Sequence, residues 1–496
     1  MRFIIIFSLV ISYFVGAAQM PTPKREFRAA WVATIGNIDW PSKQGLNAEV
    51  QKSEFRSLLF QCKKNGLNAI IVQIRPAADA LYESPFENWS RYLSGKQGQA
   101  PTPYYDPLTF MVEEAHKQCI EFHAWFNPYR ALVDANKNLH TKEHITWQHP
   151  EWFLNYGGKK YFDPGLPEVR EYFTKVVIDV VKRYDIDAVH FDDYFYPYRI
   201  ANTEFPDYKS YSKYKGEFYN KDDWRRNNVN ILIEDLSKKI KQTKPKVKFG
   251  ISPFGVWRNY SKDVEGSHTN GGQTNYDDLY ADVILWLKKG WIDYILPQLY
   301  WEVGHKAADY TELLRWWSEH SYGKNLYIGH GLYQVGVSSK SCWRSMFEIE
   351  NQVSALRNIK NVKGSAYYSA NAFKKNLCDV NYSMQNTINP RPALLPLMTW
   401  IDDEAPKAPS LKLSTGGDGY RVLQWTVDNP QKEDLQFAIY RFLPNEKIAN
   451  TSATNLIDIV RGNNYVDKSN SNTNYSYIVT SLDRLHNESA PSNVVD

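Results

Sequence analysis

Short apolar runs alternate with longer amphipathic segments from residue 27 to about residue 387. Such runs are typical of buried strands, whereas apolar positions that recur with a period of 3.6 indicate helices. We count eight strands, at residues 27–34, 69–75, 121–127, 187–193, 248–254, 293–300, 326–332 and 364–370. The helices between them are clearest at residues 49–65, 107–118, 167–184, 222–242, 277–289 and 343–357.

Eight strand–helix units in series predict a closed (β/α)8 TIM barrel of the α/β class, in preference to an open doubly wound sheet. The links that lead from a helix into the next strand are very short, as at residues 65–68. The links that follow the strands are long, as at residues 128–166 and 194–221. In such barrels the loops after the strands build the active site, so we expect functional side chains there.

The pattern changes after residue 388, where apolar positions begin to alternate with a period of two. Proline-rich segments at residues 389–392 and 404–409 predict a stiff linker. Strands are expected at residues 422–427, 437–442 and 475–482. We therefore divide the mature chain into a catalytic barrel, residues 19–402, and a small all-β sandwich, residues 403–496.

The N-terminus has the organisation of a secretory signal peptide, which we assign to residues 1–18. Arg2 provides a positive charge, residues 3–15 are apolar, and small residues follow at 16–18. This apolar stretch is too short to cross a bilayer, and no later segment is apolar enough to do so. We therefore expect an exported protein, periplasmic or extracellular, with no transmembrane anchor.

Composition narrows the classes of partner. A net charge of +4, from 59 basic and 55 acidic residues, is too balanced to predict nucleic-acid binding. Aromatic residues make up 15% of the chain, which suits stacking on the apolar faces of sugar rings. The four cysteines fit no zinc pattern, so we expect free thiols, although a Cys342–Cys378 disulfide stays open. No phosphate loop or metal-ligand spacing occurs, so we expect no cofactor and no metal.

Two adjacent carboxylates, Asp192 and Asp193, end the fourth predicted strand and precede three aromatic residues. Strand alternation puts His190 and Asp192 on one face, so both should line the pocket, with Asp193 at its rim. Paired carboxylates suit glycoside hydrolysis, in which one donates a proton and the other stabilises charge at the anomeric carbon. Close like charges also raise one pKa, which keeps an acid protonated near neutral pH. The alternative is that Asp193 caps a turn or pairs with an arginine.

The sixth predicted strand ends in Gln298 and Tyr300, which share a face and could hydrogen bond a substrate amide or the reacting centre. Glu302 follows them and is either a second catalytic carboxylate or a solvated loop acid. Polar and aromatic residues recur at the other strand ends, at Gln73, Arg75, Asn127, Tyr129, Arg130, Ser252, Trp257, His330 and Tyr368. Each is as typical of a satisfied buried polar group as of a substrate contact, but together they predict a binding ring.

Six motifs carry a family resemblance: FRAAWVAT at 27–34 with NIDWP at 37–41, VQIRP at 72–76, WFNPYR at 125–130, HFDDYFYP at 190–197, ISPFGVWR at 251–258 and PQLYW at 297–301. Together they resemble the glycosyl-hydrolase-like family 10 domain, over roughly residues 26–389. The motifs add further candidate substrate-binding residues, namely Trp31, Asn37, Trp40, Tyr194, Tyr196 and Trp301. The tail from residue 475 to 484, with Trp425 and Tyr440, resembles a fibronectin type III module.

The resemblance implies a bacterial, exported hydrolase of amino-sugar polysaccharides, and some members of the family are linked to hydrolysis of peptidoglycan glycan strands. It also leaves two mechanisms open. In substrate assistance, Asp192 orients the acetamido group of the sugar, Asp193 is the general acid and Tyr300 helps to hold the intermediate. In direct double displacement, Asp192 or Asp193 acts together with Glu302.

Two rival functions remain at this stage. One is a catalytically silent polysaccharide-binding protein that keeps the aromatic cleft, and the other is a hydrolase of a glycan other than peptidoglycan. Replacing Asp192 and Asp193 by Asn distinguishes a hydrolase from the binding protein. A hydrolase loses turnover while it retains binding, whereas a binding protein shows no turnover before or after the change. The sequence leaves open the linkage, endo or exo action, the oligomeric state and any docking partner of the C-terminal module.

Overall fold

The computed structural model describes residues 20–135, 141–417, 419–428, 434–469 and 473–496, so the predicted signal peptide lies outside the described residues. Parallel strands close into a barrel in the order β1 (Phe27–Val32), β2 (Ala69–Arg75), β3 (Glu121–Phe126), β7 (Ala188–Phe191), β8 (Lys248–Ile251), β9 (Tyr294–Ile295) with β10 (Gln298–Leu299), β11 (Asn325–His330) and β12 (Val362–Tyr367). Pairing of β12 with β1 completes the ring. Among the described residues, β9 and β10 together form the sixth of eight barrel strands, with an interruption between them. The predicted (β/α)8 barrel is therefore confirmed.

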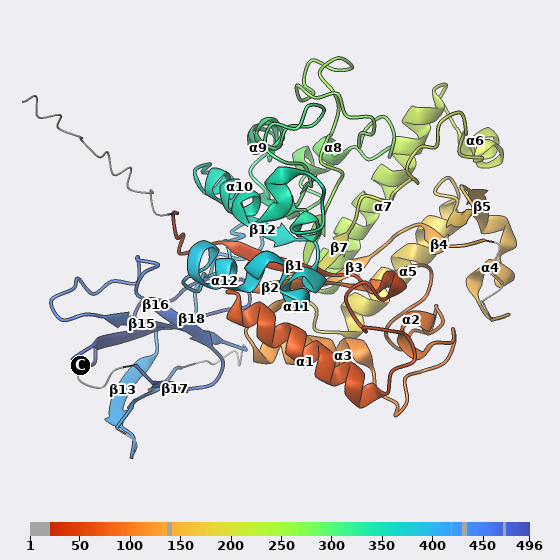
Figure 1. Cartoon of the computed structure of the whole chain (residues 1–496). Helices are drawn as coiled ribbons and strands as arrows, with labels where there is room; N and C mark the ends of the chain where they lie inside the picture. The colour runs from red at the N-terminus through yellow and green to blue at the C-terminus, as the bar shows by residue number, and fades with distance from the viewer. Residues whose placement is uncertain (1–19, 136–140, 418, 429–433, 470–472) are drawn as a thin grey trace, which may run out of the picture.

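Helices surround the barrel (Figure 1). The longer ones are α1 (Ala48–Lys64), α3 (Pro107–Lys117), α5 (Pro167–Arg183), α7 (Lys221–Thr243), α9 (Tyr310–Glu319) and α10 (Phe347–Arg357). The shorter ones are α2 (Arg91–Ser94), α4 (Ile145–Gln148), α6 (Tyr208–Tyr214), α8 (Val283–Lys288), α11 (Ala370–Lys375) and α12 (Val380–Ser383). The predicted helix at 277–289 is reduced to α8, because Thr274 and Asp278 tie the preceding residues into turns.

The loop between β3 and α5 carries a small antiparallel sheet that the sequence pattern did not predict. It consists of β4 (Arg130–Leu132), β5 (Phe153–Tyr156) and β6 (Lys159–Phe162), in the order β4-β6-β5. Its strands are short and mix charged with aromatic residues, so they show no clear alternation. The sheet extends the barrel on the side of the long loops (Figure 1).

Alternating side chains of the strands fill the barrel interior. A buried cluster there includes Phe27, Ala29, Trp31, Ala188 and Tyr294. The other face of each strand packs against the helices, for example Val72 and Val189 in the larger core. This division follows from the period of two in a strand, and it leaves the axis of the barrel for a few large or polar side chains.

Residues after the barrel close its base. Leu395 and Met398 belong to the interior cluster, and the backbone of Leu394 exchanges hydrogen bonds with Lys24 and Glu26. The first proline-rich segment therefore leads directly into chain that is packed against the barrel and does not act as a free linker. The second segment, residues 404–409, is largely exposed.

The C-terminal module contains two antiparallel sheets within its described residues, as the alternating pattern predicted. One has the order β13 (Ser410–Thr415), β14 (Arg421–Thr426) and β17 (Asn464–Asp467), and the other β16 (Leu456–Val460), β15 (Gln436–Phe442) and β18 (Ser476–Leu482). Leu423, Trp425, Ile439 and Tyr477 pack between them. Figure 1 shows this module, in blue, against one end of the barrel.

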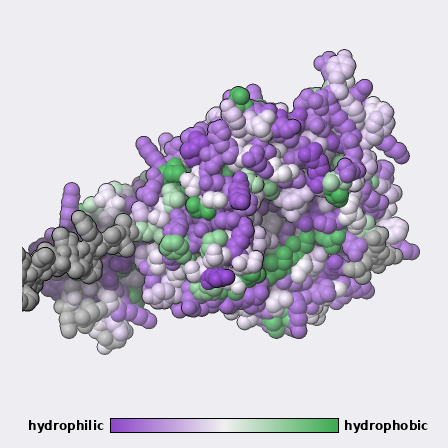
Figure 2. Space-filling view, turned by 45° about the horizontal axis from the view of Figure 1, so that its top comes forward, coloured by the Kyte–Doolittle hydropathy of each residue, from purple (hydrophilic) through white to green (hydrophobic). Residues whose placement is uncertain are grey.

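The surface is mostly hydrophilic on the face shown in Figure 2, where hydrophobic residues gather in a band beside a hollow. None of the described helices has the length and apolar character that a membrane crossing requires. All four cysteines carry free thiols, with Cys62 and Cys119 buried, Cys342 half-buried and Cys378 exposed.

Candidate active site

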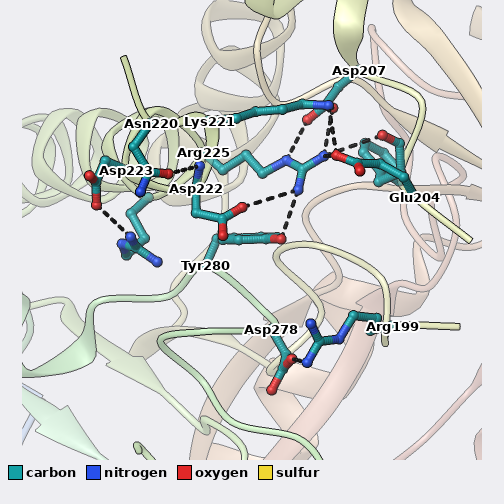
Figure 3. Close-up of polar contacts among 12 residues, drawn as sticks. Arg199, Glu204, Asp207, Asn220, Lys221, Asp222, Asp223, Arg225, Asp278 and Tyr280 are labelled. Carbon is teal, nitrogen blue, oxygen red and sulfur yellow. Dashed lines mark hydrogen bonds and ion pairs between the residues drawn. The ribbon is translucent and has the colours of Figure 1, made fainter. Parts of the chain in front are cut away.

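A buried ion pair anchors the long loop that follows β7. Arg225 on α7 donates from Nε and Nη2 to the two carboxylate oxygens of Asp207, over 2.8 and 2.7 Å. Its Nη1 also donates to the hydroxyl of Tyr280, over 2.7 Å, and Lys221 adds a second cation 2.8 Å from Asp207 (Figure 3). Asp207 is fully buried. The loop that carries Tyr194 and Tyr198 is therefore fixed at its far end.

A pocket of about 250 Å³ opens at the C-terminal ends of the strands. Predicted residues that line it are Trp31, Asp192, Asp193, Tyr194, Ser252, Gln298, Tyr300, Trp301 and Tyr368. Tyr198, Phe254 and Tyr333, from the aromatic loops and strand ends, also line it, and so does Trp125, which was not among the predicted residues. Trp125 alternates with Asn127 along β3, and that period could have revealed it. Tyr333 lies in the 3-10 turn Leu332–Gln334, directly after β11.

Asp192 is held by neutral donors. Its Oδ2 accepts hydrogen bonds from Trp125 Nε1 and Asn127 Nδ2, both over 3.0 Å, and the backbone nitrogen of Tyr194 donates to Oδ1 over 3.3 Å. Burial raises the pKa of Asp192, and these donors together with nearby Arg130 only partly offset the effect. The side chain is therefore fixed in direction, with its charge only partly compensated.

Asp193 is buried, with 1% of its surface exposed, instead of standing at the rim as predicted. The hydroxyl of Tyr198 donates to its Oδ2 over 2.5 Å. Burial and the neighbouring Asp192 raise the pKa of Asp193 to about 7, against the lowering effect of Tyr198 and Gln298. A carboxyl with that pKa holds a proton near neutral pH and can donate it, as a general acid must.

Aromatic rings form the walls of the pocket. The ring of Tyr300 lies 6.5 Å from Trp31 in an edge-on contact and 5.9 Å from Tyr368 in a stacked one. On the other side, Tyr194 stacks on Tyr198 at 5.1 Å between centroids. Rings in such walls offer both apolar faces for a sugar and hydroxyls for hydrogen bonds.

Several predicted residues support the pocket without lining it. Asn127 holds Asp192, and the guanidinium of Arg130 lies over the ring of Tyr194, 5.1 Å from its centroid. His190 lies beneath the floor, fully buried, where its Nε2 lies 3.0 Å from Ser252 Oγ. Two further predicted residues, Gln73 and Arg75, are also buried outside the pocket. Gln73 accepts a hydrogen bond from the backbone nitrogen of Ile35, and Arg75 forms an ion pair with Glu87.

Glu302 is not brought to the pocket. Its carboxylate lies 2.6 Å from Lys340 Nζ, and Trp343 donates to its other oxygen over 3.4 Å. The chain leaves the barrel after β10, so a residue three positions beyond Leu299 lies on the outer loop layer. The prediction that placed Glu302 near the paired aspartates therefore does not match the structure.

Six other predicted residues also lie outside the pocket. Asn37 donates to the backbone oxygens of Pro41 and Tyr92, and Trp40 donates to that of Gln51. The remaining four are buried: Tyr129, Tyr196, Trp257, which stacks on Trp316, and His330, which bonds Gln352 and Ser365. Each fills a packing or hydrogen-bonding role, which is the alternative that a sequence cannot exclude.

Two larger depressions lie elsewhere on the molecule. One, of about 670 Å³, lies between α1 and α11, and the other, of about 700 Å³, lies beside Arg199 and Tyr280. Neither includes Asp192 or Asp193, so size alone does not identify the site. Across the described residues, no group of three or more His, Cys, Asp and Glu side chains is arranged to hold a metal ion.

Comparisons with known proteins identify the family and the fold. Residues 26–345 match the family described as glycosyl hydrolase-like 10. The chain is 45% identical to glycosyl hydrolase YngK of Bacillus subtilis (strain 168), across 99% of this chain and 97% of that protein. It is 41% identical to glycosyl hydrolase DigH of Escherichia coli (strain K12), across 63% and 74%. The glycoside hydrolase domain of PgaB (BpsB) from Bordetella bronchiseptica has a similar fold, with a TM-score of 0.50 at 11% identity, across 74% of this chain and 99% of that one.

Proposed function

We propose that this chain cleaves an amino-sugar polysaccharide. The premise is that it belongs to the glycosyl hydrolase-like 10 family and is a glycoside hydrolase. The substrate that we favour is the glycan strand of bacterial peptidoglycan, because the family resemblance implies it. An exported enzyme with a cleavable signal peptide at residues 1–18 would meet that substrate outside the cytoplasm.

The observation that carries this proposal is the contrast between the two adjacent carboxyl groups. The pKa of Asp193 is raised to about 7, so this group is the general acid that protonates the glycosidic oxygen. Asp192 is oriented by Trp125 and Asn127 and remains a hydrogen-bond acceptor. An acceptor fixed beside an acid suits a substrate whose own acetamido group attacks the anomeric carbon.

The steps then follow in order. Asp193 transfers its proton to the leaving oxygen while the acetamido oxygen of the sugar bonds to the anomeric carbon. Asp192 accepts a hydrogen bond from the acetamido nitrogen and stabilises the positive charge that develops there. The hydroxyl of Tyr300, on the pocket wall, helps to hold this cyclic intermediate. Asp193, now ionised, removes a proton from water, which opens the ring and releases the product.

Direct double displacement is less well supported. That mechanism needs a second carboxylate across the pocket from the acid, at a separation of about 5–5.5 Å. Glu302 was the candidate, and its carboxylate is engaged by Lys340 on the outer loops. Substrate assistance needs no such residue, since the sugar provides the nucleophile.

The experiment is digestion of purified peptidoglycan, with intact stem peptides and with the peptides removed, followed by mass spectrometry of the products. A chitin oligosaccharide tests an amino-sugar polymer from outside the cell wall, and a de-N-acetylated strand tests the need for the acetamido group. We expect cleavage of the N-acetylated strands and none of the de-N-acetylated ones. Cleavage of both at equal rates would exclude substrate assistance, and cleavage of chitin alone would exclude peptidoglycan.

For residues 403–496, we propose a fibronectin type III-like module. The strand orders β13-β14-β17 and β16-β15-β18 support this, as does the pairing of Tyr477 with Val495, which adds a closing segment beside β18. Because this module is docked on the base of the barrel, we assign it a supporting role. Limited proteolysis of the intact protein should cut the exposed residues 404–409 without releasing the module from the barrel.

A further inference from the structure

A continuous line of buried hydrogen bonds runs along the barrel axis beneath the pocket. Ser252 Oγ lies 3.0 Å from His190 Nε2, and His190 Nδ1 lies 2.9 Å from the hydroxyl of Tyr294. The same hydroxyl lies 2.8 Å from His123 Nδ1, and His123 Nε2 lies 3.1 Å from Glu121 Oε2. None of the five residues is more than 5% exposed. The line joins the pocket floor to the base of the barrel.

The barrel is built to accommodate this line. Its members come from β3, β7, β9 and the end of β8, and each occupies an inward position. The ring of Tyr294 crosses the barrel over Gly250, where an added Cβ would lie 1.9 Å from the Cζ of Tyr294. Only glycine leaves room for that crossing. The ring also stacks on His190, with 5.9 Å between centroids.

The lower end of the line has a defined direction. Burial raises the pKa of Glu121, but the ion pair with Lys248 and the contact with His123 together outweigh that effect and lower it. An ionised carboxylate only accepts hydrogen bonds, so His123 must donate from Nε2. Because Lys248 already balances the carboxylate, a neutral imidazole completes the pair without adding a buried charge. The Nδ1 of a neutral His123 is then an acceptor.

Tyr294 passes the same direction of hydrogen bonding on to His190. Its hydroxyl has one proton and lies between two imidazole nitrogens, those of His123 and His190. This proton is donated to His123 Nδ1, so the hydroxyl oxygen accepts from His190 Nδ1. His190 is neutral, because burial holds its pKa well below the usual range. Its Nε2 is therefore an acceptor, and the hydroxyl of Ser252 donates to it. The alternative acceptor for Ser252, the backbone oxygen of Phe191, is more distant at 3.3 Å.

We propose that this line, from Glu121 through His123, Tyr294 and His190, makes Ser252 an obligatory hydrogen-bond acceptor toward the pocket. The one proton of Ser252 Oγ is used below the floor, so only its lone pairs face a ligand. The pocket then selects a hydroxyl or an amide N–H at that place. Glu121, His123, Tyr294 and His190 are positioning residues, and the identity of the ligand as a sugar rests on the proposed function.

The test is a direct measurement of the histidine tautomers in the full-length protein. With ¹⁵N-labelled histidine, long-range ¹H–¹⁵N spectra distinguish a protonated ring nitrogen from an unprotonated one, and the signals of His190 and His123 are identified by their loss in H190Q and H123Q. We expect a proton on Nδ1 of His190 and on Nε2 of His123. A proton on Nε2 of His190 would overturn the proposal, because His190 would then donate to Ser252 Oγ and the Ser252 proton would be free to donate to a ligand.

Tyr294→Phe removes the bridging hydroxyl and keeps the ring. We expect the nitrogen signals of His190 to change to those of a tautomer mixture, whereas Tyr327→Phe, at a neighbouring buried tyrosine outside the line, should leave them unchanged. Unchanged His190 signals in Tyr294→Phe would contradict the proposal. On a cleaved glycan, Tyr294→Phe should raise KM about tenfold with kcat within about twofold, and an unchanged KM would count against an acceptor role for Ser252. If no glycan is cleaved, the proposed function fails, while the tautomer spectra still decide the present proposal.

Discussion

The two ends of the barrel treat buried carboxylates in opposite ways. At the pocket end, Asp192 and Asp193 form no ion pair with any described Lys, Arg or His, and burial raises the pKa of both. At the base, Asp187 lies 2.8 Å from His116 and 2.9 Å from Arg484 of the C-terminal module. These cations outweigh burial and hold the pKa of Asp187 well below its usual range.

The difference separates chemistry from stability. A buried acid without a cation costs folding free energy, and it is retained where its proton is useful. A buried acid with its cations in place contributes to the fold and is inert as a proton donor. Asp187 directly precedes β7 and Asp192 directly follows it. The two aspartates with these different roles are therefore separated by a single strand.

The largest effect is expected from Asp193→Asn at the pocket end. The amide cannot donate a proton to the leaving oxygen, so kcat/KM should fall by about 10³-fold, within the range of general acid catalysis. The melting temperature should stay the same or rise, because a buried acid without a cation has been removed. Glycan cleavage assays and thermal unfolding measure the two quantities. A stable variant that keeps more than a tenth of the activity would show that Asp193 is not the acid.

Asp187→Asn reverses the pattern at the base. Breaking a buried charge network should lower the free energy of unfolding by about 3 kcal/mol, with kcat/KM of the folded protein unchanged. The folded pKa of Asp187 is depressed, so its contribution is complete above about pH 4 and is lost as the pH falls further. Denaturant unfolding at pH 7 and at pH 3 should therefore show a smaller difference from wild type at pH 3. Equal differences at both pH values would argue against the ion pairs as the cause.

The pH profile sharpens the comparison further. Asp193 must be protonated to act, and its pKa is about 7, so kcat/KM should fall tenfold for each pH unit above that value. This alkaline limb should disappear with an aryl glycoside whose leaving group needs no proton. If the natural glycan shows no limb between pH 6 and 9, a different group supplies the proton.

The smallest effect is expected from Glu302→Gln. Its partner Lys340 is half exposed, and exposed ion pairs contribute about 0–1 kcal/mol. Stability should change by about 0.5 kcal/mol or less, and kcat/KM should stay within about twofold. Lys340→Gln is the matched control for the pair. A loss of turnover in Glu302→Gln alone would restore direct double displacement.

Much of the fold could be predicted because hydrophobic period and chain order decide it. The predicted strand at 69–75 coincides with β2. The predicted helix at 49–65 is shifted from α1 by one residue at each end, and the one at 167–184 exceeds α5 by one residue at its C-terminal end. Helix α9 was not among the predicted helices, although it is strongly amphipathic and buries Leu313, Leu314 and Trp317 on one face. The interruption between β9 and β10 includes Pro297, which has no N–H for the ladder.

The candidate site could be predicted only in part, because strand alternation acts over a few residues. It brought Asp192, Ser252 and Gln298 to one pocket. It could not show where the chain leaves the barrel, which decides the position of Glu302. The partners of His190 depend on the register between β7, β8 and β9, which pairs His190 with Gly250 and Gly250 with Tyr294. No pattern within one strand contains that information.

The seal at the base has a consequence for the order of assembly. β1 pairs with β12, the interior is closed by Leu395 and Met398, and the base is bound by Arg484. During synthesis at about 5–20 residues per second, the first strand waits roughly 20–90 s for the last of these residues. A nascent chain that ends before β12 keeps two open strand edges and an unsealed interior. Closure of the barrel is therefore a late event in synthesis, and the contact of Arg484 with Asp187 at the base comes later still.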